Sequence, residues 1–162
     1  MRLTALGHIL KEKKLDLGKQ YGDLTKTLGE ILLTPTEIYT LDCLALIKLL
    51  GEDLRTCSHV TGGGLADNTA RVVPDGLTAR FDRSTWALPQ ELVFMAHEGG
   101  VQQNDYERTW NCGVGMVAIV DAASADLAIK ALAARGMQAW AAGSVGATTP
   151  GAARAALEGD YR

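Results

Sequence analysis

Three consecutive glycines, Gly62–Gly64, constrain the fold of this chain more than any other feature of its sequence. They follow a short stretch typical of a strand, Thr56–Val60, and precede an amphipathic segment that begins near Leu65. Glycine loses more conformational entropy on folding than any other residue, so a simple turn rarely keeps three of them. Without Cβ atoms, the backbone N–H groups can approach an anion closely, and a helix start adds the positive end of its dipole. The pattern predicts a loop that binds a phosphorylated ligand.

Polar side chains flank this glycine run. His59 ends the predicted strand, Thr61 follows it, and Asn68 lies inside the predicted helix. Imidazole gains and loses a proton near neutral pH, so His59 is a candidate for handling protons. Thr61 could donate to a phosphate or cap the helix. Structural alternatives remain open for each: a strand-end histidine bound to backbone, a tight turn without a ligand, or an asparagine on a helix surface.

A second glycine cluster opens the most apolar predicted strand, and it reads Arg108-Thr109-Trp110-Asn111-Cys112-Gly113-Val114-Gly115-Met116. It lacks the third glycine and the strand-before-helix setting of a dinucleotide fingerprint, which excludes that function. Glycines in strands often only mark a bulge or a close contact. Gly113 and Gly115 are therefore expected to serve either packing or ligand contact, and Arg108 is either a surface cation or an anion contact.

Composition excludes several classes of protein. The chain has 162 residues, of which 47% are hydrophobic, and this is enough for a single domain over residues 1–162 with a core of its own. Its net charge of −3 and the lack of a basic stripe argue against nucleic-acid binding. No apolar run is long enough for a membrane span. The three widely spaced cysteines fit reduced thiols in the cytoplasm, and neither a disulfide framework nor a zinc site.

Hydrophobic periodicity predicts an α/β (α+β) fold, in which a mixed β-sheet is layered with helices. The predicted helices are Leu3–Lys13, Leu28–Leu33, Tyr39–Leu50, Ala66–Val72, Pro89–Glu98 and Ala122–Arg135. The predicted strands are Thr56–Val60, Leu77–Phe81, Gly113–Val120, Gln138–Val145 and Ala153–Leu157. The helix over 39–50 is expected to be amphipathic, with apolar positions Leu41, Leu44, Ala45, Ile47 and Leu49. The strand over 113–120 is expected to be buried on both faces.

Further short motifs accompany the two glycine clusters in a fixed order along nearly the whole chain. They are Leu33-Thr34-Pro35-Thr36, Ile38-Tyr39, Arg71-Val72 with Pro74, Trp86 and Val101. In this order and spacing, the set resembles the C-terminal domain of phosphoribosylformylglycinamidine cyclo-ligase, the aminoimidazole ribonucleotide synthetase of purine biosynthesis. The sequence departs from the family's usual pattern at Trp110, where Phe is usual, and at Asp105-Tyr106, where Glu-Met is usual.

The resemblance implies an ATP-dependent ring closure of formylglycinamidine ribonucleotide. It implies a catalytic or substrate-orienting role for His59, and contacts to substrate or phosphate from Thr61, Gly62, Gly63, Gly64, Asn68, Arg108, Gly113 and Gly115. In this family the ATP and Mg²⁺ carboxylates and the main dimer interface belong to an N-terminal domain. We therefore expect this chain alone to hold no metal, ATP or Mg²⁺, to be inactive, and to be a monomer or weak dimer that needs the N-terminal domain as a partner.

Two other functions remain open at this stage. The chain could be the matching domain of a related ATP-dependent enzyme, such as selenophosphate synthetase, thiamine-monophosphate kinase or formylglycinamide ribonucleotide amidotransferase. It could also be a non-catalytic module that binds phosphate or a partner chain. The string over 108–116 and the Leu-Thr-Pro-Thr string favour the cyclo-ligase.

Overall fold

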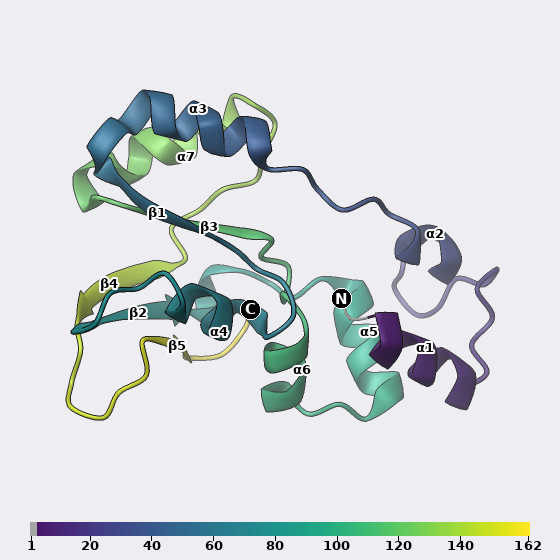
Figure 1. The fold of residues 1–162 in the computed structure, drawn as a ribbon. Helices are drawn as coiled ribbons and strands as arrows, with labels where there is room; N and C mark the ends of the chain where they lie inside the picture. The colour runs from purple at the N-terminus through teal and green to yellow at the C-terminus, as the bar shows by residue number, and fades with distance from the viewer. Residues whose placement is uncertain (1–2) are drawn as a thin grey trace.

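The computed structural model describes residues 3–162, and its strands form two sheets (Figure 1). The strands are β1 (Leu54–His59), β2 (Leu77–Asp82), β3 (Met116–Val120), β4 (Gly143–Ala147) and β5 (Ala155–Glu158). β1 and β3 form an antiparallel pair. In the second sheet, β2 lies between β4, which is antiparallel to it, and β5, which is parallel. The predicted α+β class with a mixed sheet is confirmed, although the strands are divided between two sheets.

Some helices lie against the sheets, and another group of helices lies to one side of them (Figure 1). The helices are α1 (Leu3–Glu12), α2 (Leu28–Leu32), α3 (Thr40–Leu50), α4 (Gly64–Ala70), α5 (Gln90–Gly99), α6 (Gln103–Thr109) and α7 (Ala125–Ala133). Thr27 and Glu30 form a capping box that starts α2, and Gly100, at φ 60°, ends α5 in a left-handed conformation. The sequence analysis did not predict α6, because its residues are almost all polar and show no apolar period.

Two predictions about strands are wrong in detail. All five residues of β3 are half-buried, not buried on both faces. The reason is that β3 pairs with β1 only, while one of its faces lines a groove of about 750 Å³ between the two sheets. The strand predicted over 138–145 begins only at Gly143, because residues 138–142 join no ladder.

Buried apolar side chains form three clusters. The first joins α1, α2 and α5 to Trp110 and Cys112. The second lies around Phe81 and Trp86, between α4 and the β2 sheet. The third is small and lies where α3 and α7 pack over the β1–β3 pair. The two glycine clusters of the sequence therefore lie between separately packed layers.

Helix α3 packs through a different face than its apolar pattern indicates. Leu46 and Leu50 are buried, whereas the predicted apolar positions Leu41, Leu44, Ile47 and Leu49 are 69%, 55%, 53% and 47% exposed. Ile38 and Leu33, which precede the helix in the sequence, are 77% and 82% exposed. Large apolar residues that gather on one surface usually mark an interaction site. We call the five residues 38, 41, 44, 47 and 49 the α3 surface; Leu33 lies at the end of α2, apart from α3 (Figure 1).

A buried ion pair connects α6 to the end of β2. Arg83 Nε donates to Glu107 Oε1 at 2.8 Å, and the two side chains are only 13% and 10% exposed. Glu107 also accepts hydrogen bonds from the Tyr161 hydroxyl at 2.9 Å and from Gln103 at 3.1 Å. Burial would raise the pKa of Glu107, but the hydrogen bonds from Arg83, Tyr161 and Gln103 outweigh it and lower the pKa.

We expect Glu107→Gln to lower the free energy of unfolding by about 2–4 kcal/mol at pH 7, because Arg83 would be left buried without its counter-charge. The folded-state pKa of Glu107 is depressed, so its stabilisation is present above the unfolded pKa and is lost as the pH falls through the folded pKa. The difference between wild type and variant should therefore shrink below about pH 4 in urea unfolding. Glu158→Gln, at the exposed pair with Arg80, is the matched control and should change stability little. A pH-independent difference for Glu107→Gln would contradict this prediction.

Candidate functional site

The antiparallel pairing of β1 and β3 brings the two glycine clusters to the same end of one strand pair. His59 lies opposite Met116 in the register, and the N–H of Val60 donates to the carbonyl of Gly115 at 2.9 Å. Residues 62–64 leave β1 where residues 113–115 enter β3. Segments that are some fifty positions apart in the sequence are therefore neighbours, and His59 lies between them.

The glycine run is shaped mainly by close packing against α6. Gly63 and Gly64 have φ values of +107° and +75°, in the region that favours glycine. A Cβ on Gly64 would overlap the carbonyl oxygen of Glu107 and come within 3.3 Å of the Cα of Arg108. A Cβ on Gly63 would meet nothing closer than 3.4 Å. Gly64 is therefore needed for helix packing, whereas a Cβ on Gly63 would make only ordinary contacts with Asp67, Asn68 and Arg71.

Asn68 holds the glycine loop together. It is buried, and its side-chain nitrogen donates to the carbonyl of Gly64 at 2.7 Å, with longer contacts to the carbonyls of Thr61 and Gly62 at 3.3 and 3.4 Å. Thr61 donates to the Asn68 side-chain oxygen at 3.3 Å. Neither structural alternative for these residues applies: Asn68 is not on the helix surface, and Gly63, not Thr61, is the N-cap of α4.

His59 is exposed at the open end of β1, with the edge of the Tyr39 ring beside it at 6.1 Å between ring centroids. Within residues 3–162 its imidazole has no hydrogen-bond partner, so the described backbone does not satisfy it. The ring nitrogens are thus free to meet a substrate. The arrangement is suited to proton transfer or to orienting a polar group.

Tyr39 is a site residue that the sequence analysis named only as part of a motif. Its hydroxyl lies so close to Gly115 that any Cβ there would overlap it. Burial, and then the charge of Glu37, raise the pKa of Tyr39. One sequence signal pointed to this contact: Tyr39 and Gly115 belong to the same ordered set of motifs. Apolar periodicity carries no information about such a contact.

Gly113 serves packing in a tight turn. It has φ +86°, and a Cβ on it would lie 3.0 Å from the ring of Pro89, at the start of α5. The preceding residue, Cys112, is buried and also has a positive φ, of 52°. The indole of Trp86 donates to the Cys112 carbonyl at 3.0 Å and fixes this turn.

Two arginines flank the glycine loop. The Arg108 backbone packs against Gly64, and its side chain is exposed. Arg71, which the sequence analysis named only as part of a motif, reaches within 3.6 Å of the position that a Cβ of Gly63 would take. Their positive charge would favour an anion at this loop. Among residues 3–162, no three His, Cys, Asp or Glu side chains gather so that they could hold a metal ion. The described residues therefore do not fit a Mg²⁺ site.

The family of AIR synthase related proteins, C-terminal domain, matches residues 3–155. The chain belongs to this family. A Streptomyces fradiae protein provisionally named phosphoribosylformylglycinamidine cyclo-ligase is 45% identical over 90% of this chain and 80% of its own length. The phosphoribosylformylglycinamidine cyclo-ligases of Sorangium cellulosum and Burkholderia cenocepacia are 44% and 43% identical over 83% and 80% of this chain. The chain spans only 39% and 36% of these two longer relatives. The resemblance inferred from the sequence is confirmed, and none of the described helices is long and apolar enough to cross a membrane.

We expect Gly64→Ala to lower the free energy of unfolding by more than about 3 kcal/mol, because it combines a positive φ with overlap of the Glu107 carbonyl. Gly63→Ala is the matched control, since it carries only the φ penalty of about 1–2 kcal/mol. Urea unfolding followed by circular dichroism measures both. Equal losses for the two variants would show that contact with α6 does not determine the loop.

Proposed function

We propose that this chain is the substrate-side domain of an ATP-dependent cyclo-ligase that converts formylglycinamidine ribonucleotide to aminoimidazole ribonucleotide in purine biosynthesis. The observation that carries the proposal is the meeting of both glycine clusters around the exposed His59 at one end of the β1–β3 pair. The names of the relatives supply the reaction. The free cysteines fit the reducing cytoplasm in which we place it.

In this proposal each part of the site has a distinct task. The backbone N–H groups of residues 61–63 hold a phosphate of the substrate, helped by the charges of Arg71 and Arg108, whereas the N–H of Gly64 already donates to the Thr61 carbonyl at 3.1 Å. His59 accepts the proton of the amidine nitrogen as that nitrogen attacks the activated formyl carbon. Tyr39 and Asn68 keep the imidazole and the loop in place. ATP supplies the phosphoryl group that makes the formyl oxygen a good leaving group, and no residue described here is assigned to Mg²⁺ or to that transfer.

We further propose that the α3 surface docks the portion of the longer cyclo-ligases that lies outside the match. More than half of each longer relative has no counterpart in this chain. The α3 surface holds five of the ten exposed large apolar side chains of the described chain. Covering it by a second domain would remove these side chains from water, which the isolated chain cannot do.

We expect the purified chain to form no aminoimidazole ribonucleotide from formylglycinamidine ribonucleotide and ATP, and to gain activity when the N-terminal half of a longer relative is added. Leu41→Ser with Leu44→Ser should weaken this rescue at least about tenfold, because two anchors of the apolar contact are lost. Leu127→Ser, at a leucine on α7 that is 48% exposed, should not. Imidazole formation is the readout. Robust activity of the chain alone, or equal rescue of both variants, would overturn this part of the proposal.

We expect inorganic phosphate to shift the amide signals of residues 61–68 in an NMR titration at millimolar concentrations. Gly63→Val should abolish the shifts, because a β-branched side chain at φ +107° would crowd Asn68 and Arg71 and cover the loop amides. Gly76→Val, at another glycine with positive φ but away from the loop, should leave them unchanged. His59→Asn should preserve phosphate binding yet abolish activity in the reconstituted enzyme. If the loop amides do not respond to tens of millimolar phosphate, the loop is only a turn.

A further inference from the structure

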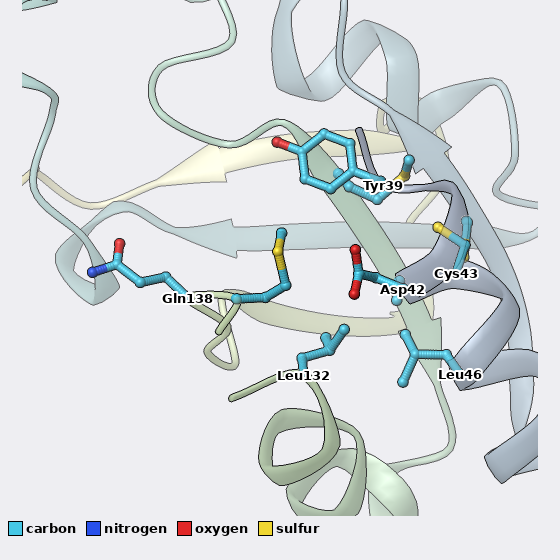
Figure 2. A pocket seen from close by; sticks show the side chains of 10 residues that line it. Tyr39, Asp42, Cys43, Leu46, Leu132 and Gln138 are labelled. Carbon is cyan, nitrogen blue, oxygen red and sulfur yellow. The ribbon is translucent and has the colours of Figure 1, made fainter. Parts of the chain in front are cut away.

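A cavity of about 80 Å³ lies between α3, the β1–β3 pair and the segment that follows α7 (Figure 2). Its lining is unusually rich in sulfur. Cys43, Cys57, Met116 and Met137 all line it, which is two of the three cysteines and two of the four methionines of the chain. In Figure 2 the Cys43 sulfur lies on the α3 side of the cavity, above Leu46. Tyr39, which lies beside His59 in the proposed site, also lines the cavity, so the two adjoin, but the proposed function assigns no task to the sulfur side chains.

The strand register explains why the sulfur side chains meet. Cys57 pairs with Ala118, and His59 pairs with Met116. Alternate residues of a strand point to the same face, so Cys57 and Met116 lie diagonally on one face of the pair. Helix α3 packs on β1 and brings Cys43 to this face.

We propose that this cavity is a binding site for a soft monovalent metal ion, Cu(I), held by the sulfur atoms of Cys43 and Cys57 with Met116 and Met137 as thioether ligands. Thiolate and thioether donors together select soft ions. Asp42, the one carboxylate in the lining, is already paired with Arg135 at 2.6 Å. In the described chain no three His, Cys, Asp or Glu side chains are placed to hold a metal together, and Asp42 is committed to Arg135, which disfavours Zn²⁺ and harder ions.

The same thiols could instead form a disulfide. The presence of a cavity beside them favours metal binding over a disulfide. A disulfide places its sulfur atoms in bonding contact and needs no space between four sulfur side chains. A metal ion needs such a space. On binding, the ion replaces the two thiol protons, which pass to solvent, and no electron is transferred. The site therefore needs no oxidant.

The test is an anaerobic titration of the reduced full chain with Cu(I) in competition with a chromogenic Cu(I) chelator, repeated with Ag(I) as a redox-stable probe. We expect one ion per chain, and at least a hundredfold weaker binding for Cys43→Ser and for Cys57→Ser. Met116→Leu and Met137→Leu should weaken binding roughly tenfold. Cys112→Ser removes a buried thiol outside the cavity and should bind as wild type, provided that circular dichroism shows it folded.

A second measurement does not depend on variants. Ag(I) should shift the side-chain methyl signals of Met116 and Met137 in NMR spectra of the wild-type chain, while Met95, buried in the first cluster, stays unchanged. Three results would overturn the proposal: binding that survives both cysteine substitutions, unmoved methyl signals at Met116 and Met137, or Zn²⁺ binding as tight as that of Cu(I). Formation of a Cys43–Cys57 disulfide under mild peroxide, without a one-to-one complex with Cu(I), would assign the pair to redox chemistry instead.

Discussion

The antiparallel pairing of β1 with β3 is the constraint on which the rest of the site depends. One short ladder sets Val60 against Gly115 and His59 against Met116. Because the side-chain period of a strand is two, a slip of one residue would turn His59 and Cys57 to the opposite face. The candidate active site and the sulfur-lined cavity both follow from this one register, on neighbouring parts of the same strand pair.

The glycine loop shows how packing and function share the same residues. Gly64 is required because α6 lies against it, and the Asn68 side-chain nitrogen donates to the loop carbonyls. The Asn68 side-chain nitrogen is therefore not free to bind a ligand. The two residues provide a fixed loop beside Arg71 and the backbone of Arg108. Such preorganisation is what a phosphate site requires, since the donors need no rearrangement when the anion arrives.

The buried Arg83–Glu107 ion pair and the exposed α3 surface differ in how far their side chains are shielded from water. The Arg83–Glu107 pair is nearly enclosed, and hydrogen bonds from Tyr161 and Gln103 offset the desolvation of the carboxylate. By contrast, the α3 surface leaves leucine and isoleucine side chains in water, although α3 has enough buried contacts through Leu46 and Leu50 to stay attached. The ion pair is enclosed, whereas the apolar side chains of the α3 surface are exposed.

The sequence by itself determined the α+β class, most helix positions, the family and the strand–glycine–helix unit, because these follow from local periodicity, from glycine's conformational freedom and from ordered motifs. The sequence analysis missed α6, because its polar residues carry no periodic signal. It also assigned the wrong buried face to α3, because apolar residues occur on several faces of this helix and their pattern does not indicate which face is covered. The roles of Tyr39, Arg71 and Asn68 depend on contacts across the fold or within a loop whose shape no local pattern fixes. Only the tertiary structure decided which glycine is needed for packing and which sulfur atoms share a cavity, since both depend on the distance between elements remote in the chain.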